Sequence, residues 1–163
     1  MRLVPISVGL CLLAGGVPIA SADQACRPVV GHFEASIVPP GVEHCPNDPQ
    51  AFCTAGRVWG GIQGQYQFVI TALHPSVVMG GVPTIMFFTG QSTIFLKSGD
   101  EMTGTDTGSI DLPPGLGGFA SLITFTGGTG AMTGASGQIR LRGEFSATAG
   151  TTTGDYLGTV CTP

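Results

Sequence analysis

Gly127-Gly128-Thr129-Gly130-Ala131-Met132-Thr133-Gly134-Ala135-Ser136-Gly137 is the stretch that decides the fold class. It joins two segments in which apolar and polar residues alternate, 119–126 before it and 138–147 after it. A glycine loop that binds phosphate opens a helix, whereas this one opens a segment with the period of a strand. The glycines therefore indicate a connection between two bent strands, not a nucleotide site.

The rest of the chain divides into segments of strand length at clusters of Gly, Pro, Asn and Asp. In the segment 65–74, the alternation places Tyr66, Phe68, Ile70 and Ala72 on one face. No segment has the pattern of a long amphipathic helix. We expect strands over 29–38, 52–60, 65–74, 84–97, 101–111, 119–126, 138–147 and 151–161.

Consecutive strands joined mostly by short turns favour a closed sheet. An open sheet would leave two exposed edges, and closure removes them. We therefore predict an all-β fold, a single eight-stranded antiparallel up-and-down barrel with little or no helix. A barrel of this size is either just filled by side chains or holds one small ligand.

The first 22 residues have the pattern of a secretory signal peptide. Arg2 is followed by the mostly apolar run 3–14 and by the small-residue signal Ala20-Ser21-Ala22. We expect cleavage between Ala22 and Asp23, which leaves a secreted or periplasmic barrel domain over 23–163. The apolar run is too short to span a bilayer and no later segment is long enough, so no transmembrane segment is predicted.

Removal of Cys11 with the leader leaves Cys26, Cys45, Cys53 and Cys161. An even number of cysteines in a small exported domain indicates disulfides, and the spacing is not that of a zinc site. In an up-and-down barrel the first strand starts at the end where the eighth finishes. This favours Cys26–Cys161 with Cys45–Cys53, and the alternative is Cys26–Cys45 with Cys53–Cys161.

Composition excludes some classes of function. The formal net charge is −4, with 6 Lys and Arg against 10 Asp and Glu. Nucleic acid is not an expected partner, because phosphate binding needs clustered Lys and Arg. The 27 glycines and the scarcity of charged residues suit short strands and tight turns rather than a helical bundle.

Four polar residues are candidates for catalysis, each with a structural alternative. Glu34 shares a strand face with His32 and could serve in acid–base chemistry, although that face is expected to meet solvent. Asp106 could stabilise a cationic intermediate, but a surface position bonded to nearby Thr hydroxyls is favoured. Arg57 shares a face with Trp59, and the pair forms either an anion-and-stacking site or an exposed packing contact.

Tyr66 is the fourth catalytic candidate and also belongs to a set of aromatic residues. These side chains line a cavity in the barrel or simply fill its core. The sequence shows no nucleophile elbow, no Cys–His pairing and no metal-ligand spacing, so neither a cofactor nor a metal is predicted. The predicted cavity aromatics are Tyr66, Phe68, Phe88, Phe119, Phe125 and Phe145.

The chain contains several Gly- and Thr-rich motifs, namely Cys53-Thr54-Ala55-Gly56, Phe88-Thr89-Gly90, Thr103-Gly104-Thr105-Asp106-Thr107-Gly108, Thr126-Gly127-Gly128-Thr129-Gly130, Gly134-Ala135-Ser136-Gly137 and Leu141-Arg142-Gly143. These motifs resemble those of secreted bacterial members of the allene-oxide-cyclase-like barrel superfamily, and the plant dirigent proteins carry a similar Gly-Gly-Thr-Gly. Met132 stands where the family usually has Phe. The resemblance implies an eight-stranded barrel with an apolar cavity. Characterised relatives cyclise an unsaturated fatty-acid epoxide or steer radical coupling of phenols without a cofactor, and many are trimers.

Three functions fit these observations. The first is a binding protein that holds one small apolar, lipid-like or phenolic molecule in the barrel. The second, implied by the resemblance, is a cofactor-free cyclase, isomerase or dirigent-like coupling guide. The third is a structural cell-envelope protein that forms a homo-oligomer, a dimer or a trimer, and an exposed band around Met86 and Phe88 would favour it.

Overall fold

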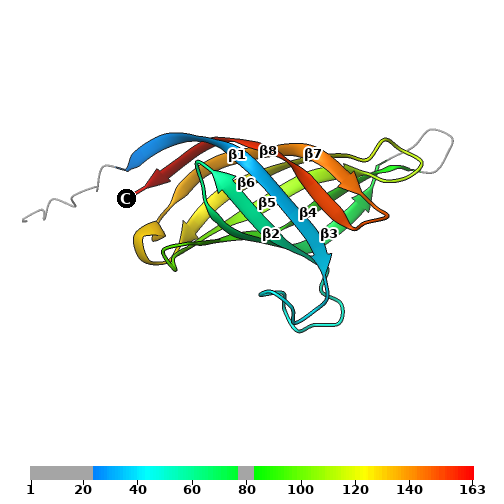
Figure 1. Cartoon of the computed structure of the whole chain (residues 1–163), viewed down its shortest axis with the longest axis horizontal. Helices are drawn as coiled ribbons and strands as arrows, with labels where there is room; N and C mark the ends of the chain where they lie inside the picture. The colour runs from blue at the N-terminus through cyan, green and yellow to red at the C-terminus, as the bar shows by residue number, and fades with distance from the viewer. Residues whose placement is uncertain (1–23, 77–82) are drawn as a thin grey trace, which may run out of the picture.

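The computed structural model describes residues 24–76 and 83–163, which form one closed barrel (Figure 1). Every strand pairs antiparallel with its sequence neighbours, and β1 pairs with β8 to close the sheet. The predicted fold class is therefore confirmed. The strands are β1 (Ala25–Val38), β2 (Cys53–Gly60), β3 (Gly64–Pro75), β4 (Ile85–Leu96), β5 (Glu101–Asp111), β6 (Gly118–Gly128), β7 (Ser136–Ser146) and β8 (Thr151–Thr162).

Some sequence predictions lie outside the described residues. These are the signal peptide and its cleavage site before Asp23. Within residues 24–76 and 83–163, no helix has the length and apolar character needed to cross a membrane.

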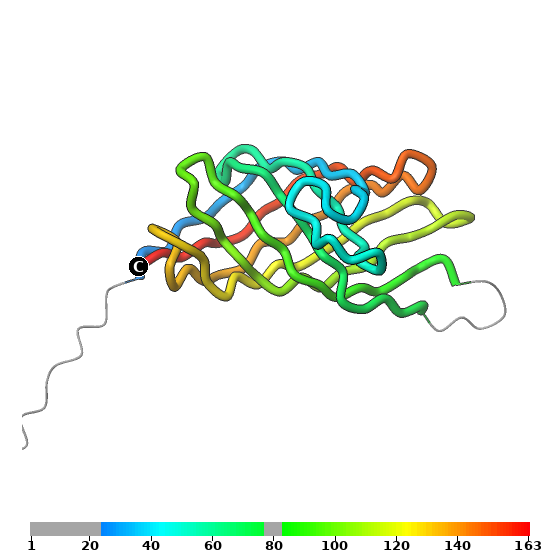
Figure 2. The backbone as a smooth tube through the Cα atoms, turned by 90° about the horizontal axis from the view of Figure 1, so that it is seen from below, coloured from blue at the N-terminus to red at the C-terminus, as the bar shows by residue number. Residues whose placement is uncertain are grey.

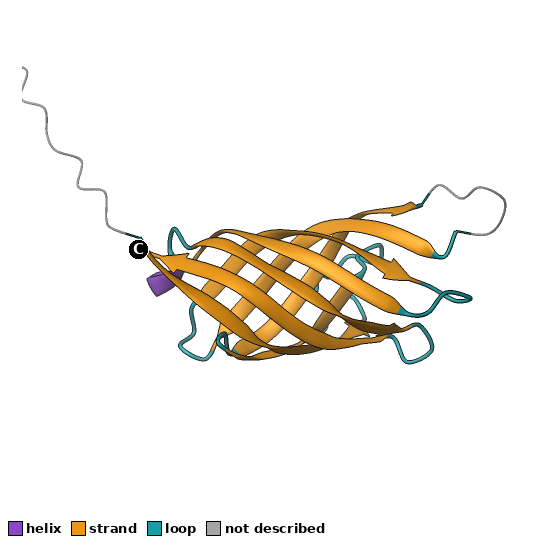
Figure 3. Ribbon diagram, turned by 90° about the horizontal axis from the view of Figure 1, so that it is seen from above, coloured by secondary structure: helices purple, strands orange, loops and turns teal. Residues whose placement is uncertain are grey.

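The glycine-rich stretch connects two strands, as predicted. β6 runs to Gly128, and a single turn of 3₁₀ helix, η1 (Gly130–Met132), follows before β7 begins. Figure 3 shows this turn at the same end of the barrel as the C-terminus. Gly130 has a φ of 53°, and a Cβ at this position would collide with the Asp100 carboxylate. The glycine is thus required by a tight strand connection.

A β-bulge corrects the predicted face of Ala72. The pairing of β3 with β4 slips between Ile70 and Ala72. Residues that lie opposite each other on antiparallel strands point to the same side. Leu73, opposite the buried Phe88, takes the inward position, and Ala72, opposite the exposed Thr89, faces outward. The extra residue reverses the alternation that the sequence pattern predicts.

The half of the barrel nearest the termini is filled. Tyr156 on β8 extends across it to the turn between β2 and β3. Its hydroxyl accepts a hydrogen bond of 2.7 Å from the Ile62 backbone N–H and donates one of 3.1 Å to the Ile62 carbonyl oxygen. Ile94, Ile123 and Ile139 are fully buried beside this plug. The packing leaves this end of the barrel closed.

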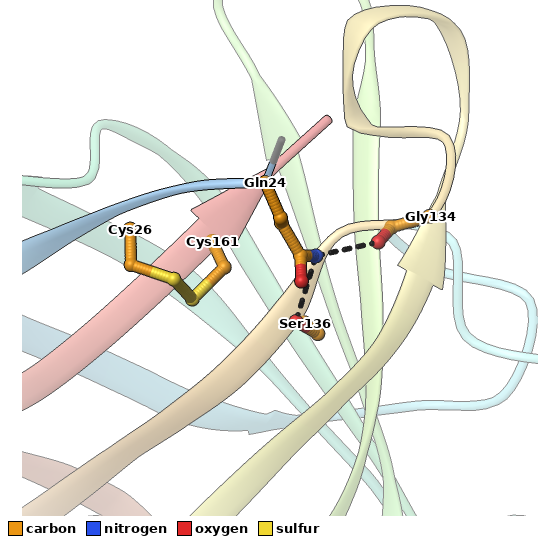
Figure 4. The surroundings of a disulfide bond; sticks show 5 residues. All are labelled: Gln24, Cys26, Gly134, Ser136 and Cys161. Atoms are coloured by element: carbon orange, nitrogen blue, oxygen red, sulfur yellow. Dashed lines mark hydrogen bonds between the residues drawn. A yellow bond between two sulfur atoms is a disulfide. The ribbon is translucent and has the colours of Figure 1, made fainter. Parts of the chain in front are cut away.

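The two ends of the chain are joined at this closed end. Cys26 and Cys161 lie opposite each other on β1 and β8 and form a disulfide (Figure 4). Beside it, the Gln24 side-chain amide donates hydrogen bonds of 3.1 Å to the Gly134 carbonyl oxygen and 2.8 Å to the Ser136 hydroxyl. Full-length pairing of β1 with β8 explains why β1 begins before the predicted start at residue 29.

The second disulfide, Cys45–Cys53, confirms the favoured pairing. It anchors the long connection 39–52, the cyan loop in front of the barrel in the view of Figure 2. The His44 ring stacks on Phe95 at a centroid distance of 4.0 Å, and the Gln67 side chain donates a 2.7 Å hydrogen bond to the His44 carbonyl oxygen. This connection is therefore held to the outer faces of β3 and β4.

Candidate functional site

An apolar cavity of about 190 Å³ occupies the half of the barrel away from the termini. Phe52 and Leu73 lie at its rim and remain 43% and 46% exposed, so the cavity opens at this end. The mouth lies beside the connections β5–β6 and β7–β8. Its aromatic lining consists of Phe33, Phe52, Tyr66, Phe68, Phe88, Phe119 and Phe145.

Five of the six predicted cavity aromatics belong to this lining, and Phe125 does not. Phe125 is 3% exposed and lies in the filled half of the barrel, toward the end of β6 that leads into η1. Alternation alone places every inward aromatic residue in the barrel interior. Alternation cannot show which inward residues line the cavity and which lie in the filled half, because that depends on how far the Tyr156 side chain extends across the barrel.

The aromatic wall is packed ring against ring. Phe88 meets Phe68 edge-on at 5.2 Å between centroids and stacks on Phe119 at 6.0 Å. Phe119 in turn lies 5.7 Å from Phe33. Gly108, opposite Phe88 on β5, leaves the space that this ring occupies, since a Cβ there would overlap it. These contacts hold the cavity open with fixed walls.

A buried carboxyl group with three hydroxyl partners lies at the inner end of this cavity. Asp106 on β5 is 1% exposed and lines the cavity. Its Oδ2 accepts hydrogen bonds from Ser92 on β4 at 2.8 Å and from Tyr66 on β3 at 3.3 Å. Its Oδ1 accepts one from Ser121 on β6 at 2.5 Å. Three neighbouring strands thus supply the donors, and the Tyr66 hydroxyl also lies 3.1 Å from Ser92 Oγ.

Burial dominates the electrostatics of this cluster. Desolvation raises the pKa of the Asp106 carboxyl group, and the hydrogen bonds from Ser121, Ser92 and Tyr66 partly offset the rise. The pKa of the Tyr66 hydroxyl is raised well above its usual value by burial and by the neighbouring Asp106 charge. Tyr66 is therefore a hydrogen-bond donor over the whole accessible pH range.

No cationic side chain of the described residues accompanies Asp106 in the barrel interior. All five Lys and Arg residues in these ranges are exposed, and so are the three histidines. The carboxyl group is therefore held by hydroxyl groups alone. The exposed cations are Arg27, Arg57, Lys97, Arg140 and Arg142.

The position of Asp106 overturns the favoured sequence interpretation, which placed it at the surface. The residue takes an inward position on β5, in phase with the buried Met102 and Gly104. The Thr- and Gly-rich sequence of this strand has little apolar contrast between its two faces, and so the pattern could not assign them. The alternative reading, a carboxyl group inside the barrel, is the one that the structure bears out.

Glu34 and Arg57 lie on the outer surface and do not approach the cavity. Arg57 Nε donates to Glu34 Oε1 at 2.6 Å, with the two side chains 68% and 47% exposed. The Arg57 guanidinium lies 5.6 Å from the centre of the Trp59 ring. His32, on the same face, pairs with Asp155 at 2.5 Å. Of the four candidates, the structure brings together only Asp106 and Tyr66.

Sequence reasoning missed the two serines of the cluster. Ser92 lies in phase with the inward Phe88 and Ile94 on β4, and Ser121 lies in phase with Phe119 and Ile123 on β6. A single serine at an inward position of an otherwise apolar strand face is the signal that could have identified each of them, because a buried hydroxyl needs a partner.

Among the described residues, no group of three or more His, Cys, Asp or Glu side chains is placed to hold a metal ion. Comparison of the chain with protein-family models, with curated proteins and with solved structures finds no match.

Proposed function

We propose that this protein binds one small apolar molecule inside the barrel. The observation that carries the proposal is the cavity of about 190 Å³, lined by six phenylalanines, closed at one end and open at the other. Concave apolar sites with a few convergent polar groups are typical of small-molecule binding. In another protein an engineered apolar cavity of about 150 Å³ binds benzene, so this one suits a single ring with a short substituent.

Binding of an apolar fluorescent probe tests the proposal. Ala35 lines the cavity, and Ala35→Phe would fill part of it. Ala72→Phe makes the same change on the outer face of β3 and is the matched control. We expect Ala35→Phe to abolish probe binding and Ala72→Phe to leave it unchanged. Overpacking costs roughly 1 to 3 kcal/mol, so the folded state of each variant is checked first. Unchanged binding in Ala35→Phe would reject the cavity as the binding site.

A second candidate function is cofactor-free catalysis in the same cavity, as the resemblance to the allene-oxide-cyclase-like superfamily and the dirigent proteins implies. The specific observation that favours it is the contact between Asp106 and Tyr66 at the cavity surface. A carboxyl group with a raised pKa can hold or release a proton where substrate lies. Asp106→Asn, with the exposed Glu34→Gln as control, should then remove turnover of a cyclisable or phenolic substrate without removing binding.

The oligomeric structural alternative needs a correction. Of the residues expected in the exposed band, Phe88 is buried in the cavity wall, whereas Ile85 and Phe87 on the same strand are 42% and 52% exposed. Phe88 lies inward in phase with Ser92 and Ile94 on β4, and the bulge on β3 brings Leu73 opposite it.

We also propose that the protein is exported to the periplasm or secreted. Two disulfides support this, because disulfides persist in oxidising compartments. Intact mass and N-terminal sequencing of the exported form should show Asp23 first and a mass lower by four hydrogens than the reduced chain. Retention of Met1 would contradict the proposal.

A further inference from the structure

We propose that the occupant of the cavity is a cation, a compact apolar molecule whose protonated amino group pairs with Asp106. The inference rests on the proposed binding function and adds the chemical class of the ligand. It follows from the acceptor capacity of the Asp106 carboxylate, from the absence of a counter-charge in the described barrel interior, and from the aromatic character of the walls.

The carboxylate has an acceptor position to spare. Its two oxygens offer about four lone-pair positions. Tyr66 and Ser92 donate to Oδ2, whereas Ser121 alone donates to Oδ1. The two serines do not line the cavity, but Asp106 does. A donor that reaches Asp106 from the cavity therefore meets a carboxylate whose orientation is already fixed by three hydroxyl groups and which can accept one more hydrogen bond.

The charge of this carboxylate is not neutralised by the described residues. Three hydroxyl donors favour the ionised form, but they bring no positive charge. Every Lys, Arg and His side chain of the described ranges is exposed. A buried carboxylate without a cation is costly, and a buried ion pair with full hydrogen bonding is much less so. An ammonium group supplied by the ligand would be the missing partner.

The walls favour the same class of ligand. Phe68, Phe88 and Phe119 line the cavity in contact with one another, and aromatic rings attract ammonium groups. A ligand carboxylate, as in a fatty acid, would instead place two like charges together in an apolar site. A neutral hydrocarbon would fill the volume and leave Asp106 unpaired.

Isothermal titration of benzylamine and of the isosteric benzyl alcohol tests the proposal near neutral pH. We expect the wild type to bind benzylamine about 10- to 100-fold more tightly than benzyl alcohol, the usual gain from a hydrogen bond to a charged group. Asp106→Asn should retain benzyl alcohol and lose this preference. Asp155→Asn, which removes a carboxylate from the outer surface, should leave the preference unchanged.

A second measurement needs no variant. Acidification through the titration of Asp106 should weaken benzylamine binding to the wild type and leave benzyl alcohol binding unchanged. Tyr66 is the other titratable side chain that faces Asp106, and it stays protonated in this range. Ser92 and Ser121, the partners on β4 and β6, do not titrate.

The outcomes separate this inference from the proposed function. Binding of benzyl alcohol without preference for benzylamine, or a preference that persists in Asp106→Asn, would overturn the cationic ligand and leave the cavity proposal standing. Binding of neither compound would overturn both. Loss of both compounds in Ala35→Phe, with retention in Ala72→Phe, is expected if they occupy the cavity.

Discussion

Ser121 on β6 donates a hydrogen bond of 2.5 Å to Asp106 on β5, and both side chains are buried inside the barrel. Two adjacent strands thus each place a polar side chain at an inward position, and the two side chains bond to each other in an otherwise apolar interior. Ser92 repeats the arrangement from β4, on the other side of β5. Buried polar groups that satisfy one another rigidify a core, and this one fixes the direction of a carboxyl group at the cavity.

The first prediction concerns stability and pH. Because burial raises the pKa of Asp106 in the folded state, the folded protein binds this proton more tightly than the unfolded chain does. The contribution of Asp106 is fully present below the ordinary carboxyl pKa and is lost as the pH rises through the raised value. We therefore expect Asp106→Asn to be more stable than the wild type near neutral pH, and the difference to shrink on acidification.

Thermal unfolding of the unliganded wild type and Asp106→Asn between pH 3 and pH 8 measures this difference. A change of 1 kcal/mol corresponds to about 4 °C in Tm for a domain of this size. Asp155→Asn is the control, since Asp155 is exposed on the outer face of β8. An Asp106→Asn variant that is less stable than the wild type at neutral pH would show that the hydroxyl donors outweigh the burial.

The second prediction separates the two buried tyrosines. Tyr66→Phe removes one donor from Asp106 and should raise the carboxyl pKa further, at a cost of about 1 kcal/mol in stability. Tyr156→Phe leaves the buried backbone of Ile62 unsatisfied, with a cost of about 1 to 3 kcal/mol, and should not move the pKa of Asp106. Chemical denaturation and NMR titration of the Asp106 carboxyl carbon measure the two effects. Equal pKa values in the two variants would contradict the assigned contacts.

Much of the fold could be predicted because its signals are local. The expected strand 101–111 coincides with β5, and turn residues bound most of the other strands close to their observed ends. The disulfide pairing followed from the topology, since closure of the barrel brings Cys26 beside Cys161. These features depend on the alternation of apolar and polar residues, on turn residues and on strand order, all of which can be read from the sequence.

The site could be predicted only in part, because it depends on which face of each strand is inward. On β3 and β4, the alternating aromatic residues indicated the inward face correctly as far as the bulge. Beyond the bulge, Leu73 points inward instead of Ala72. On β5 the Thr and Gly residues are compatible with either face, and Asp106 was assigned to the wrong one. The role of Ser92 and Ser121 becomes visible only when the pairing of β4 and β6 with β5 is known, because both serines bond to Asp106 on β5.

The third prediction compares the two disulfides. Cys26–Cys161 links residues separated by 135 positions, and Cys45–Cys53 links residues separated by 8. Loop-closure entropy predicts losses of about 5 and about 2.5 kcal/mol respectively when each pair is replaced by serine. Denaturant unfolding of the two double variants measures the losses. A larger loss for Cys45 and Cys53 would mean that the connection 39–52, not chain closure, limits stability.

The last prediction concerns Gly108, which makes room for the cavity wall. A Cβ at this position would overlap the Phe88 ring and the backbone oxygen of Ala120. Gly108→Ala should therefore destabilise the barrel by roughly 1 to 3 kcal/mol and displace Phe88. Gly118 on β6 has open space where a Cβ would lie, so Gly118→Ala is the matched control and should be neutral or slightly stabilising.

Denaturant unfolding and probe binding together decide this prediction. A displaced Phe88 ring changes the cavity shape, so Gly108→Ala should alter probe affinity even under conditions where the variant is fully folded. Gly118→Ala should keep the affinity of the wild type. If Gly108→Ala is destabilised but binds the probe with unchanged affinity, the strain is relieved on the Ala120 side, and Phe88 does not form part of the binding surface.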